Sequence, residues 1–288
     1  MNQTQMYQVV KQSDDNKDTD NSGNFSMYLS RTIKRPTLFF HLDITNYCNL
    51  NCRACGSYSP LAEKKFDDVK MMQKSLEHLS KLSGGICHHI NILGGEPLLH
   101  PELVSIMRMT REYFPVGSIL LVTNGTLLLQ QNEEFWETCR NNRIIIAPSH
   151  YPVDIDYEEI QRKVREEGCK YRCSAVASDM WFFSGIGEDV DSIESKRFME
   201  CVFANDCGVL KDGKLYMCPK PAKVDLVNKT FGTDFKVTEK DYIDIFKIND
   251  VDEILEFLAK PIPFCRYCSN WTMTEWGLSK RDKDEWLV

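Results

Sequence analysis

The sequence predicts an α/β fold built on a parallel sheet. Strand-like and helix-like segments alternate from residue 37 to about residue 176, and this alternation is typical of βα units. The chain has 288 residues, which suits one large domain, or one large and one small domain, and is ample for a buried core. Most of its 12 cysteines lie near residue 50 or after residue 200. These two groups mark the regions where chemistry is expected.

Short apolar runs predict the strands, and apolar residues at helical spacing predict the helices between them. After residue 176 the alternation fails, and we interpret 177–200 as a long loop with a last strand and a helix. Two further charged segments, 251–261 and the tail 279–288, are predicted to be helical. The strands are expected at 37–44, 87–93, 117–123, 143–149 and 169–176, and the helices at 69–82, 101–114, 132–142 and 156–168.

Charge and hydropathy exclude several classes of protein. The net charge of −7 argues against a nucleic-acid surface as the main function. No apolar run of about 18 residues is present, so no membrane span is expected. The first 36 residues are polar and lack a signal peptide, which favours a cytoplasmic location. In a reducing compartment, clustered cysteines indicate metal ligation rather than disulfides.

Three cysteines directly follow the first strand, in the order Cys48, Cys52 and Cys55. Parallel sheets place ligands at the carboxyl ends of their strands, so these thiols lie where a site is expected. Three are one fewer than the four that close a zinc or iron–sulfur site. A zinc knuckle with a distant fourth ligand is the alternative. Other strands end in the loops 94–97, 123–126 and 148–151, and glycines in the first two allow close approach of backbone to a ligand.

The C-x-x-x-C-x-x-C motif, followed by Gly-Gly-Glu-Pro after the second strand, resembles the radical SAM superfamily over residues 37–200. The resemblance implies a partial barrel of five to six βα units. It also implies that the three cysteines bind a [4Fe–4S] cluster with one open iron. In that family S-adenosylmethionine (SAM) binds the open iron, and its reductive cleavage yields a 5′-deoxyadenosyl radical that abstracts hydrogen from the substrate.

The resemblance also implies which loop residues bind SAM. Glycines of the second loop would meet the methionine moiety, and Glu96 its amino group. Ala54 departs from the family pattern, in which a bulky residue there contacts adenine, so Tyr47 or Tyr58 becomes the candidate for that contact. The cofactor-binding residues are expected to be Gly94, Gly95, Glu96, Pro97, Thr123, Asn124 and Ser149.

The late cysteines resemble the twitch domain, a shortened SPASM extension that binds an auxiliary [4Fe–4S] cluster. A structural zinc site is the alternative. The implied domains are a leader at 1–36, a radical SAM partial barrel at 37–198 and a small iron–sulfur domain at 199–288. The remaining cysteines within the predicted strands and helices, Cys87, Cys139, Cys169 and Cys173, are expected in the core. The resemblance implies as auxiliary-cluster ligands Cys201, Cys218, Cys265 and Cys268.

The predicted function is a radical SAM oxidoreductase or epimerase that acts on a small, carbohydrate- or cyclitol-like substrate. Cys207 is the candidate hydrogen donor of an epimerase, and His150 is a second candidate catalytic residue. The implied partners are the substrate and a flavodoxin- or ferredoxin-like electron donor, without nucleic acid or membrane. Two alternatives remain open: a maturase of a ribosomally made peptide, and a non-catalytic iron–sulfur or zinc protein.

Overall fold

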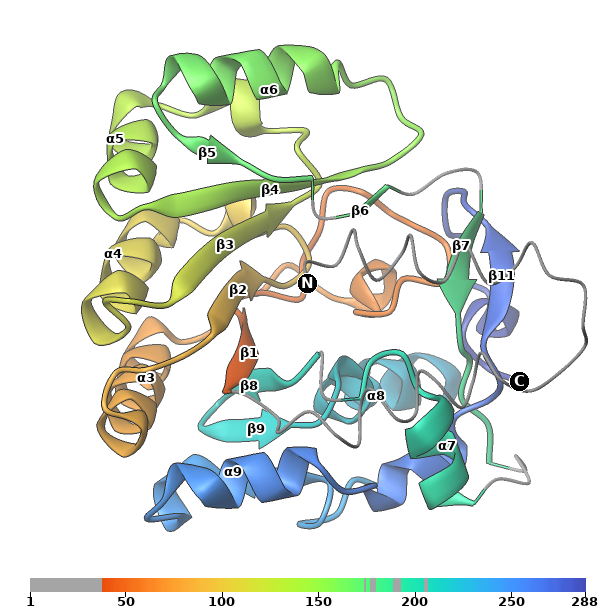
Figure 1. Cartoon of the computed structure of the whole chain (residues 1–288). Coiled ribbons are helices and arrows are strands. Elements are labelled where there is room, and N and C mark those ends of the chain that lie inside the picture. Colours follow the sequence, from red (N-terminus) through yellow and green to blue (C-terminus); the bar gives the residue numbers. More distant parts are fainter. Residues whose placement is uncertain (1–37, 174, 177–179, 189–192, 205–206) are drawn as a thin grey trace, which may run out of the picture. The chain divides into compact units, whose positions relative to one another are not determined.

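A sheet of mostly parallel strands carries the fold (Figure 1). The computed structural model describes residues 38–173, 175–176, 180–188, 193–204 and 207–288, so the predicted leader lies outside the described residues. The first four strands match the sequence prediction closely in position, and the fifth is shorter than predicted. They are β1 (Phe39–Asp43), β2 (His89–Leu93), β3 (Ser118–Thr123), β4 (Ile144–His150) and β5 (Lys170–Tyr171).

Strands β1 to β5 pair in chain order, and every one of these pairings is parallel. The predicted fifth strand at 169–176 is interrupted, because β5 and β6 (Ala175–Val176) both pair with β4. The predicted α/β partial barrel is confirmed.

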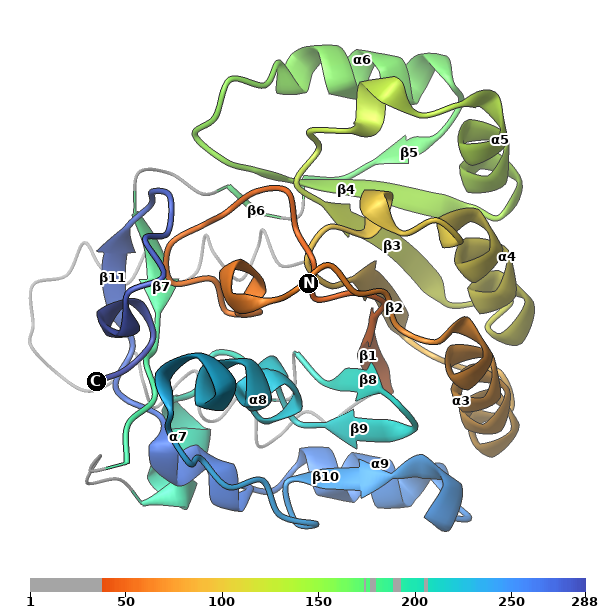
Figure 2. The ribbon, with the colours of Figure 1, turned by 180° about the vertical axis from the view of Figure 1, so that it is seen from behind.

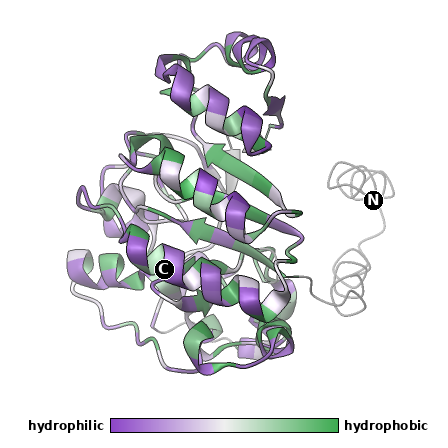
Figure 3. Cartoon of the chain, turned by 90° about the vertical axis from the view of Figure 1, so that its left-hand side faces the viewer, coloured by the Kyte–Doolittle hydropathy of each residue, from purple (hydrophilic) through white to green (hydrophobic). Residues whose placement is uncertain are grey.

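The helices cover one face of the sheet because alternate strand residues are apolar. Phe40 and Leu42 of β1 are almost completely buried, and Phe40 packs edge-on against Phe114 with ring centroids 5.7 Å apart. The intervening residues His41 and Asp43 therefore point to the opposite face. The helices in front in Figure 3 carry polar and apolar stripes, as one-sided burial requires. The helices on this face of the sheet are α3 (Val69–Ser83), α4 (Leu103–Tyr113), α5 (Glu133–Asn141) and α6 (Tyr157–Glu166).

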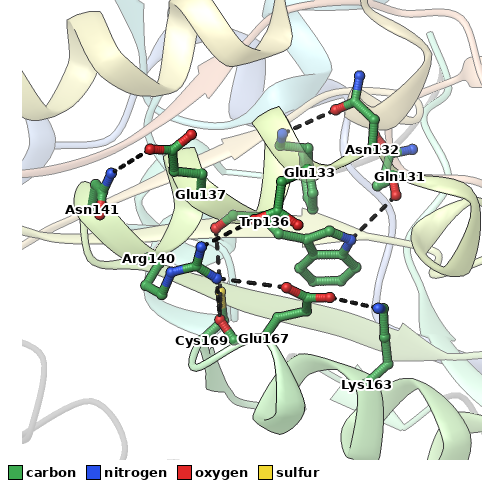
Figure 4. Close-up of polar contacts among 11 residues, drawn as sticks. Gln131, Asn132, Glu133, Trp136, Glu137, Arg140, Asn141, Lys163, Glu167 and Cys169 are labelled. Atoms are coloured by element: carbon green, nitrogen blue, oxygen red, sulfur yellow. Dashed lines mark hydrogen bonds and ion pairs between the residues drawn. The ribbon is translucent and has the colours of Figure 1, made fainter.

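Figure 4 shows how α5 and α6 are joined at the edge of this layer. Arg140 donates to the backbone oxygen of Glu167 over 2.7 Å, and Lys163 forms an ion pair with the same residue over 2.5 Å. Cys169 donates its thiol to the backbone oxygen of Trp136. Cys169 is half-buried against the core, whereas Cys87 is buried, as predicted for both.

The late part of the chain extends the sheet on the other side of β1. Strand β8 (Val209–Lys211) pairs in parallel with β1, and β9 (Lys214–Tyr216) and β10 (Tyr242–Asp244) continue the sheet in antiparallel fashion. Figure 2 shows this extension below β1, beside helix α8. Strands β7 (Met180–Phe183) and β11 (Thr272–Glu275) form a separate ribbon. The helices of this part are α7 (Glu194–Glu200), α8 (Pro219–Phe231) and α9 (Val251–Leu258).

The predicted helix at 251–261 is confirmed as α9, whereas the tail is not a regular helix. Only a short 3-10 turn, η6 (Lys283–Glu285), forms within 279–288. Residues Thr37–Val288 make one compact unit, and a boundary between residues 198 and 199 remains a prediction. In the described residues, every helix is too short or too polar to cross a membrane.

Candidate iron–sulfur and SAM site

The first cysteine group lies on the loop that leaves the carboxyl end of β1. Cys52 is buried, and Cys48 and Cys55 are half-buried. Burial raises the pKa of Cys48 and of Cys52 to about 12, and the neighbouring thiols add to the rise. The three thiols are therefore close enough to act on one another electrostatically. As a donor set they offer soft ligands held away from bulk water, which suits an iron–sulfur cluster.

The C-terminal segment 276–288 holds this loop in place. The amide of Ser279 donates to the oxygen of Asn51 over 2.8 Å, and the side chain of Asn51 donates back to the oxygen of Ser279 over 3.0 Å. The indole of Trp286 donates to the oxygen of Cys55 over 3.0 Å. Sequence reasoning missed this contact, because the charged tail resembles a surface helix. The signal available in the sequence was the tryptophan at position 286 of this charged tail. The structure shows that it is buried, with 1% of the residue exposed.

The Gly-Gly-Glu-Pro loop is hydrogen-bonded to the backbone that precedes the first cysteine. The amide of Gly95 donates to the oxygen of Thr45 over 2.6 Å, and the amide of Glu96 donates to the oxygen of Tyr47 over 2.9 Å. A Cβ atom at Gly95 would lie 2.2 Å from the oxygen of Tyr47, and one at Gly94 would lie 2.2 Å from the oxygen of Thr45. Both glycines are thus required by contact with the cysteine loop itself.

The carboxylate of Glu96 joins two of the predicted SAM-binding loops. It is fully buried and accepts from the hydroxyl of Thr123 over 2.6 Å, the amide of Asn124 over 2.8 Å and the amide of Leu98 over 2.9 Å. Burial raises the pKa of Glu96 to about 7, although these three donors act to lower it. Pro97, also predicted, is buried at the start of the short helix η2 (Pro97–Leu99). The structure therefore brings Glu96, Thr123 and Asn124 together.

Asn124 links this network to the first cysteine. Its side-chain nitrogen donates to the Cys48 Sγ over 3.7 Å and to the Oδ1 of Asn49 over 2.9 Å. Ser149 lies at the end of β4, where its backbone oxygen accepts from the hydroxyl of Tyr157 over 3.2 Å. The loops after β2 and β3 thus contact the loop that follows β1.

Tyr151 is a site residue that the sequence analysis quoted only as part of a loop. Burial raises the pKa of Tyr151 well above its usual value, and the three thiols of the cysteine loop and Glu96 add to the rise. The neighbouring His150 is held elsewhere: its Nε2 lies 2.6 Å from the hydroxyl of Tyr171, and its ring stacks on Tyr157. On this loop, Tyr151 is therefore the aromatic residue that interacts electrostatically with all three thiols.

The four late cysteines also act on one another. Cys201 follows α7, Cys218 is the N-cap of α8, and Cys265 and Cys268 lie in and after the short helix η5 (Pro263–Tyr267). Burial raises the pKa of Cys218 well above its usual value, and the other three thiols add to the rise. In the described part of the chain, no group of three or more His, Cys, Asp or Glu side chains is arranged to hold a metal ion.

Tyr58 interacts electrostatically with thiols of both cysteine groups. It is buried, and burial raises its pKa well above the usual value, with further contributions from Cys268, Cys218 and Cys55. The ring thus lies within electrostatic reach of thiols from both groups. Ala54, the departure from the family pattern, is buried with a φ of 52°.

Cys207 lies just before β8, at the amino edge of the parallel strands. The next residue, Gly208, accepts from the amide of His41, and Val209 pairs with His41 in the register of β1 and β8. Because β8 runs parallel to β1, its first residues lie at the amino edge, whereas Cys48 follows the carboxyl edge. The structure does not bring Cys207 to the first cysteine loop.

Comparisons with known proteins agree with this geometry. Residues 42–176 match the model of the Radical SAM superfamily. A GTP 3′,8-cyclase of Limosilactobacillus fermentum is 27% identical over 124 residues, which is 43% of this chain and 37% of the relative. A probable GTP 3′,8-cyclase of Pyrococcus abyssi is 32% identical over 103 residues, 36% of this chain and 32% of the relative. The chain thus spans about a third of the length of these curated relatives.

A solved structure matches more of the chain. BtrN in complex with AdoMet and 2-DOIA aligns with 81% of this chain and 93% of its own, with 20% identity and a TM-score of 0.51. At this identity the likeness shows the fold. A partial barrel with three thiols at its carboxyl edge defines the class of protein, and through residues 42–176 the chain belongs to the radical SAM superfamily. SAM and one [4Fe–4S] cluster are the cofactors that this superfamily implies.

Proposed function

We propose that this enzyme cleaves SAM reductively and abstracts hydrogen from a small, carbohydrate- or cyclitol-like substrate, giving dehydrogenation or epimerisation. One observation carries the proposal: two groups of buried or half-buried cysteines share one compact unit, and Tyr58 is within electrostatic reach of both. BtrN, with AdoMet and 2-DOIA bound, has a similar fold over most of both chains and supports a small-molecule substrate.

The residues around the first cysteine group fit a cluster and SAM. Cys48, Cys52 and Cys55 would hold a [4Fe–4S] cluster, and the four late cysteines would hold a second. When bound, the first cluster and SAM supply one-electron cleavage to a 5′-deoxyadenosyl radical, and the second cluster supplies an electron acceptor. The first loop is held rigid by protein contacts on two sides, from 94–97 and from 276–288, which preorganises its three ligands.

The protein's own residues would bind and orient SAM. Glu96 uses its carboxylate to fix Thr123 and Asn124, so these two residues present defined polar atoms beside the first cysteine. A carboxylate offers about four acceptor positions, and three are occupied by protein donors, so one remains for an ammonium group. Tyr151 contributes an aromatic wall to the same site, next to the thiols.

Anaerobic reconstitution tests the proposal. Two four-iron clusters require about eight irons and eight sulfides per chain, and changing Cys48, Cys52 and Cys55 together to Ala is expected to halve that content. Reduced enzyme with SAM is expected to form 5′-deoxyadenosine, and a panel of aminocyclitols, cyclitols and sugars should stimulate it. About four irons with bound zinc would overturn the second cluster, and absence of 5′-deoxyadenosine would overturn the reaction.

The stimulating substrate then separates the two reactions. A product two hydrogens lighter, formed equally well by Cys207→Ala, indicates dehydrogenation. Solvent deuterium at the product carbon in D2O, lost in Cys207→Ala with 5′-deoxyadenosine still formed, indicates epimerisation with Cys207 as the hydrogen donor. The position of Cys207 at the amino edge of β8 favours dehydrogenation over epimerisation.

A further inference from the structure

Lys220, in the first turn of α8, is a buried lysine beside the late cysteines. Only 6% of the residue is exposed. Its Nζ donates to the backbone oxygen of Ser184 over 2.7 Å, to the hydroxyl of Ser184 over 3.0 Å and to the Sγ of Cys268 over 3.6 Å. The ring of Trp271 lies 5.8 Å from the same nitrogen. The ammonium group is thus surrounded on several sides by protein.

All of these partners are neutral, apart from a thiol that can ionise. Among the described residues, no aspartate or glutamate forms an ion pair with Lys220, whereas Lys223, one turn along the same helix, is paired with Asp43. Removing an ammonium group from water without a negative partner is costly. A compensating negative charge is therefore expected from the late cysteines, of which Cys268 contacts the Nζ of Lys220 directly.

The electrostatic effect of Lys220 on the late cysteines also favours negative charge on their thiols. Burial raises the pKa of both Cys218 and Cys201, as do neighbouring thiols, and Lys220 acts to lower each of them. Cys218 also occupies the N-cap of α8, where the helix dipole favours negative charge. Four thiolates on a [4Fe–4S] cluster carry a net negative charge, which grows by one when the cluster accepts an electron.

We propose that Lys220 is the fixed counter-charge of the auxiliary cluster and raises its reduction potential, so that the cluster accepts an electron more readily. The inference deepens the proposed function and depends on it, because it requires a cluster on the late cysteines. In a dehydrogenation the substrate would lose one hydrogen atom to the 5′-deoxyadenosyl carbon, one hydroxyl proton to solvent and one electron to this cluster. A ferredoxin-class carrier would then reoxidise it.

Lys220 acts as a positioning residue, since the cluster's ligands are the cysteines. A cation close to a buried redox centre stabilises the more negative, reduced form, and the low local dielectric strengthens the effect. Because Lys220 is buried, salt should screen the effect weakly. Lys229, near the end of the same helix, is exposed and serves as the matched control.

The test uses full-length protein in which Cys48, Cys52 and Cys55 are changed to Ala, so that only the auxiliary cluster is loaded. Iron content is measured first, and the midpoint potential is then determined by redox titration monitored by EPR. Lys220→Gln keeps hydrogen-bonding capacity but removes the charge, and is expected to shift the potential to a more negative value at unchanged iron content. Lys220→Arg and Lys229→Met are expected to stay close to the parent.

Each outcome decides the proposal. An unchanged potential in a fully loaded Lys220→Gln would overturn the role of Lys220 while leaving the auxiliary cluster intact. Loss of iron in Lys220→Gln with retention in Lys220→Arg would support the counter-charge, expressed through cluster assembly. Loss of iron in both Lys220→Gln and Lys220→Arg would indicate a steric role for Lys220 and overturn the counter-charge. A parent protein that binds zinc or no iron would overturn the auxiliary cluster itself, and the counter-charge with it.

Discussion

Removing one member of the buried ion pair between Asp43 and Lys223 is expected to destabilise the fold strongly. Asp43 ends β1, and Lys223 comes from α8, so the pair joins the barrel to the late segment. Both side chains are 0% exposed. Neither carboxylate oxygen nor the Nζ makes a well-aligned hydrogen bond to another described residue. Each charge is therefore compensated chiefly by the other.

The magnitude follows from this burial. Breaking a buried pair by removing one partner costs about 3–5 kcal/mol, because the other charge is left uncompensated. For a protein of this size, that loss lowers the unfolding midpoint by roughly 6 to 20 °C. The double variant Asp43→Asn with Lys223→Met contains neither charge and should recover most of the loss.

The two single variants should differ. Burial lowers the pKa of Lys211, but nearby Asp43 and Asp67 raise it, for a net rise. Lys211 is therefore close enough to compensate Asp43 in part when Lys223 is replaced. Asp43→Asn instead removes the negative partner of the fully buried ammonium group of Lys223. We expect Asp43→Asn to cost more than Lys223→Met.

Thermal and urea unfolding of the metal-free protein under reducing conditions measures these effects. Lys229→Met is the control, because Lys229 is 72% exposed and its partner Glu63 is 81% exposed, and exposed pairs contribute little. If Asp43→Asn and Lys223→Met unfolded at the midpoint of this control, the reasoning from burial would be refuted. A double variant less stable than both single variants would likewise contradict it.

Three further predictions concern the cysteine loop. Gly95→Ala places a Cβ 2.2 Å from a loop carbonyl and should abolish iron binding at the first site, halving total iron, whereas Gly56→Ala, with no atom within 4 Å of its Cβ, should bind iron normally. Trp286→Phe loses one buried hydrogen bond, and is expected to cost about 1 kcal/mol in urea unfolding and to speed loss of iron to a chelator. Burial raises the pKa of Glu96 from 4.5 to about 7, so the folded protein holds this proton more tightly. Its contribution to stability is present below pH 4.5 and is lost as the pH rises to about 7. The metal-free Glu96→Gln variant should lose this pH dependence, and an equal slope in both proteins would contradict the assignment.

Local patterns were sufficient to predict the barrel. The apolar spacing at 69–82 corresponds to α3 (Val69–Ser83), and the alternation at 117–123 corresponds to β3 (Ser118–Thr123). Helical and strand periods arise from contacts of each segment with one core, so they can be read from one stretch of sequence. The order of the loops then followed from the parallel topology, because the carboxyl ends of parallel strands lie together.

Long-range pairings could not be predicted in the same way. Nothing within Val209–Lys211 shows that this short strand pairs with β1, about 170 residues earlier in the chain. The contact of Trp286 with the cysteine loop spans 231 residues. Such contacts depend on shape and on single hydrogen bonds rather than on a period, and a charged tail with one tryptophan resembles any amphipathic surface helix.

In the Gly-Gly-Glu-Pro loop, a second physical constraint besides ligand binding requires glycine. Its glycines were expected to admit a ligand, and the structure gives each a second constraint, namely the backbone of the cysteine loop. A Cβ at either position would overlap a carbonyl oxygen of that loop. The ligand and the neighbouring loop therefore demand the same residue, and only the structure distinguishes the two demands.

The first cysteine loop is held by segments from both ends of the described chain. It follows β1 directly, but its backbone is bonded to 276–288, and β1 itself pairs with β8. Cys48, Cys52 and Cys55 therefore cannot reach their final arrangement until the late segment has folded onto the barrel. The Asp43–Lys223 pair joins the same two parts, between the strand that precedes the first cysteines and the helix that begins at Cys218. The parts of the chain that carry the two cysteine groups are thus packed together, and Tyr58 interacts electrostatically with thiols of both groups.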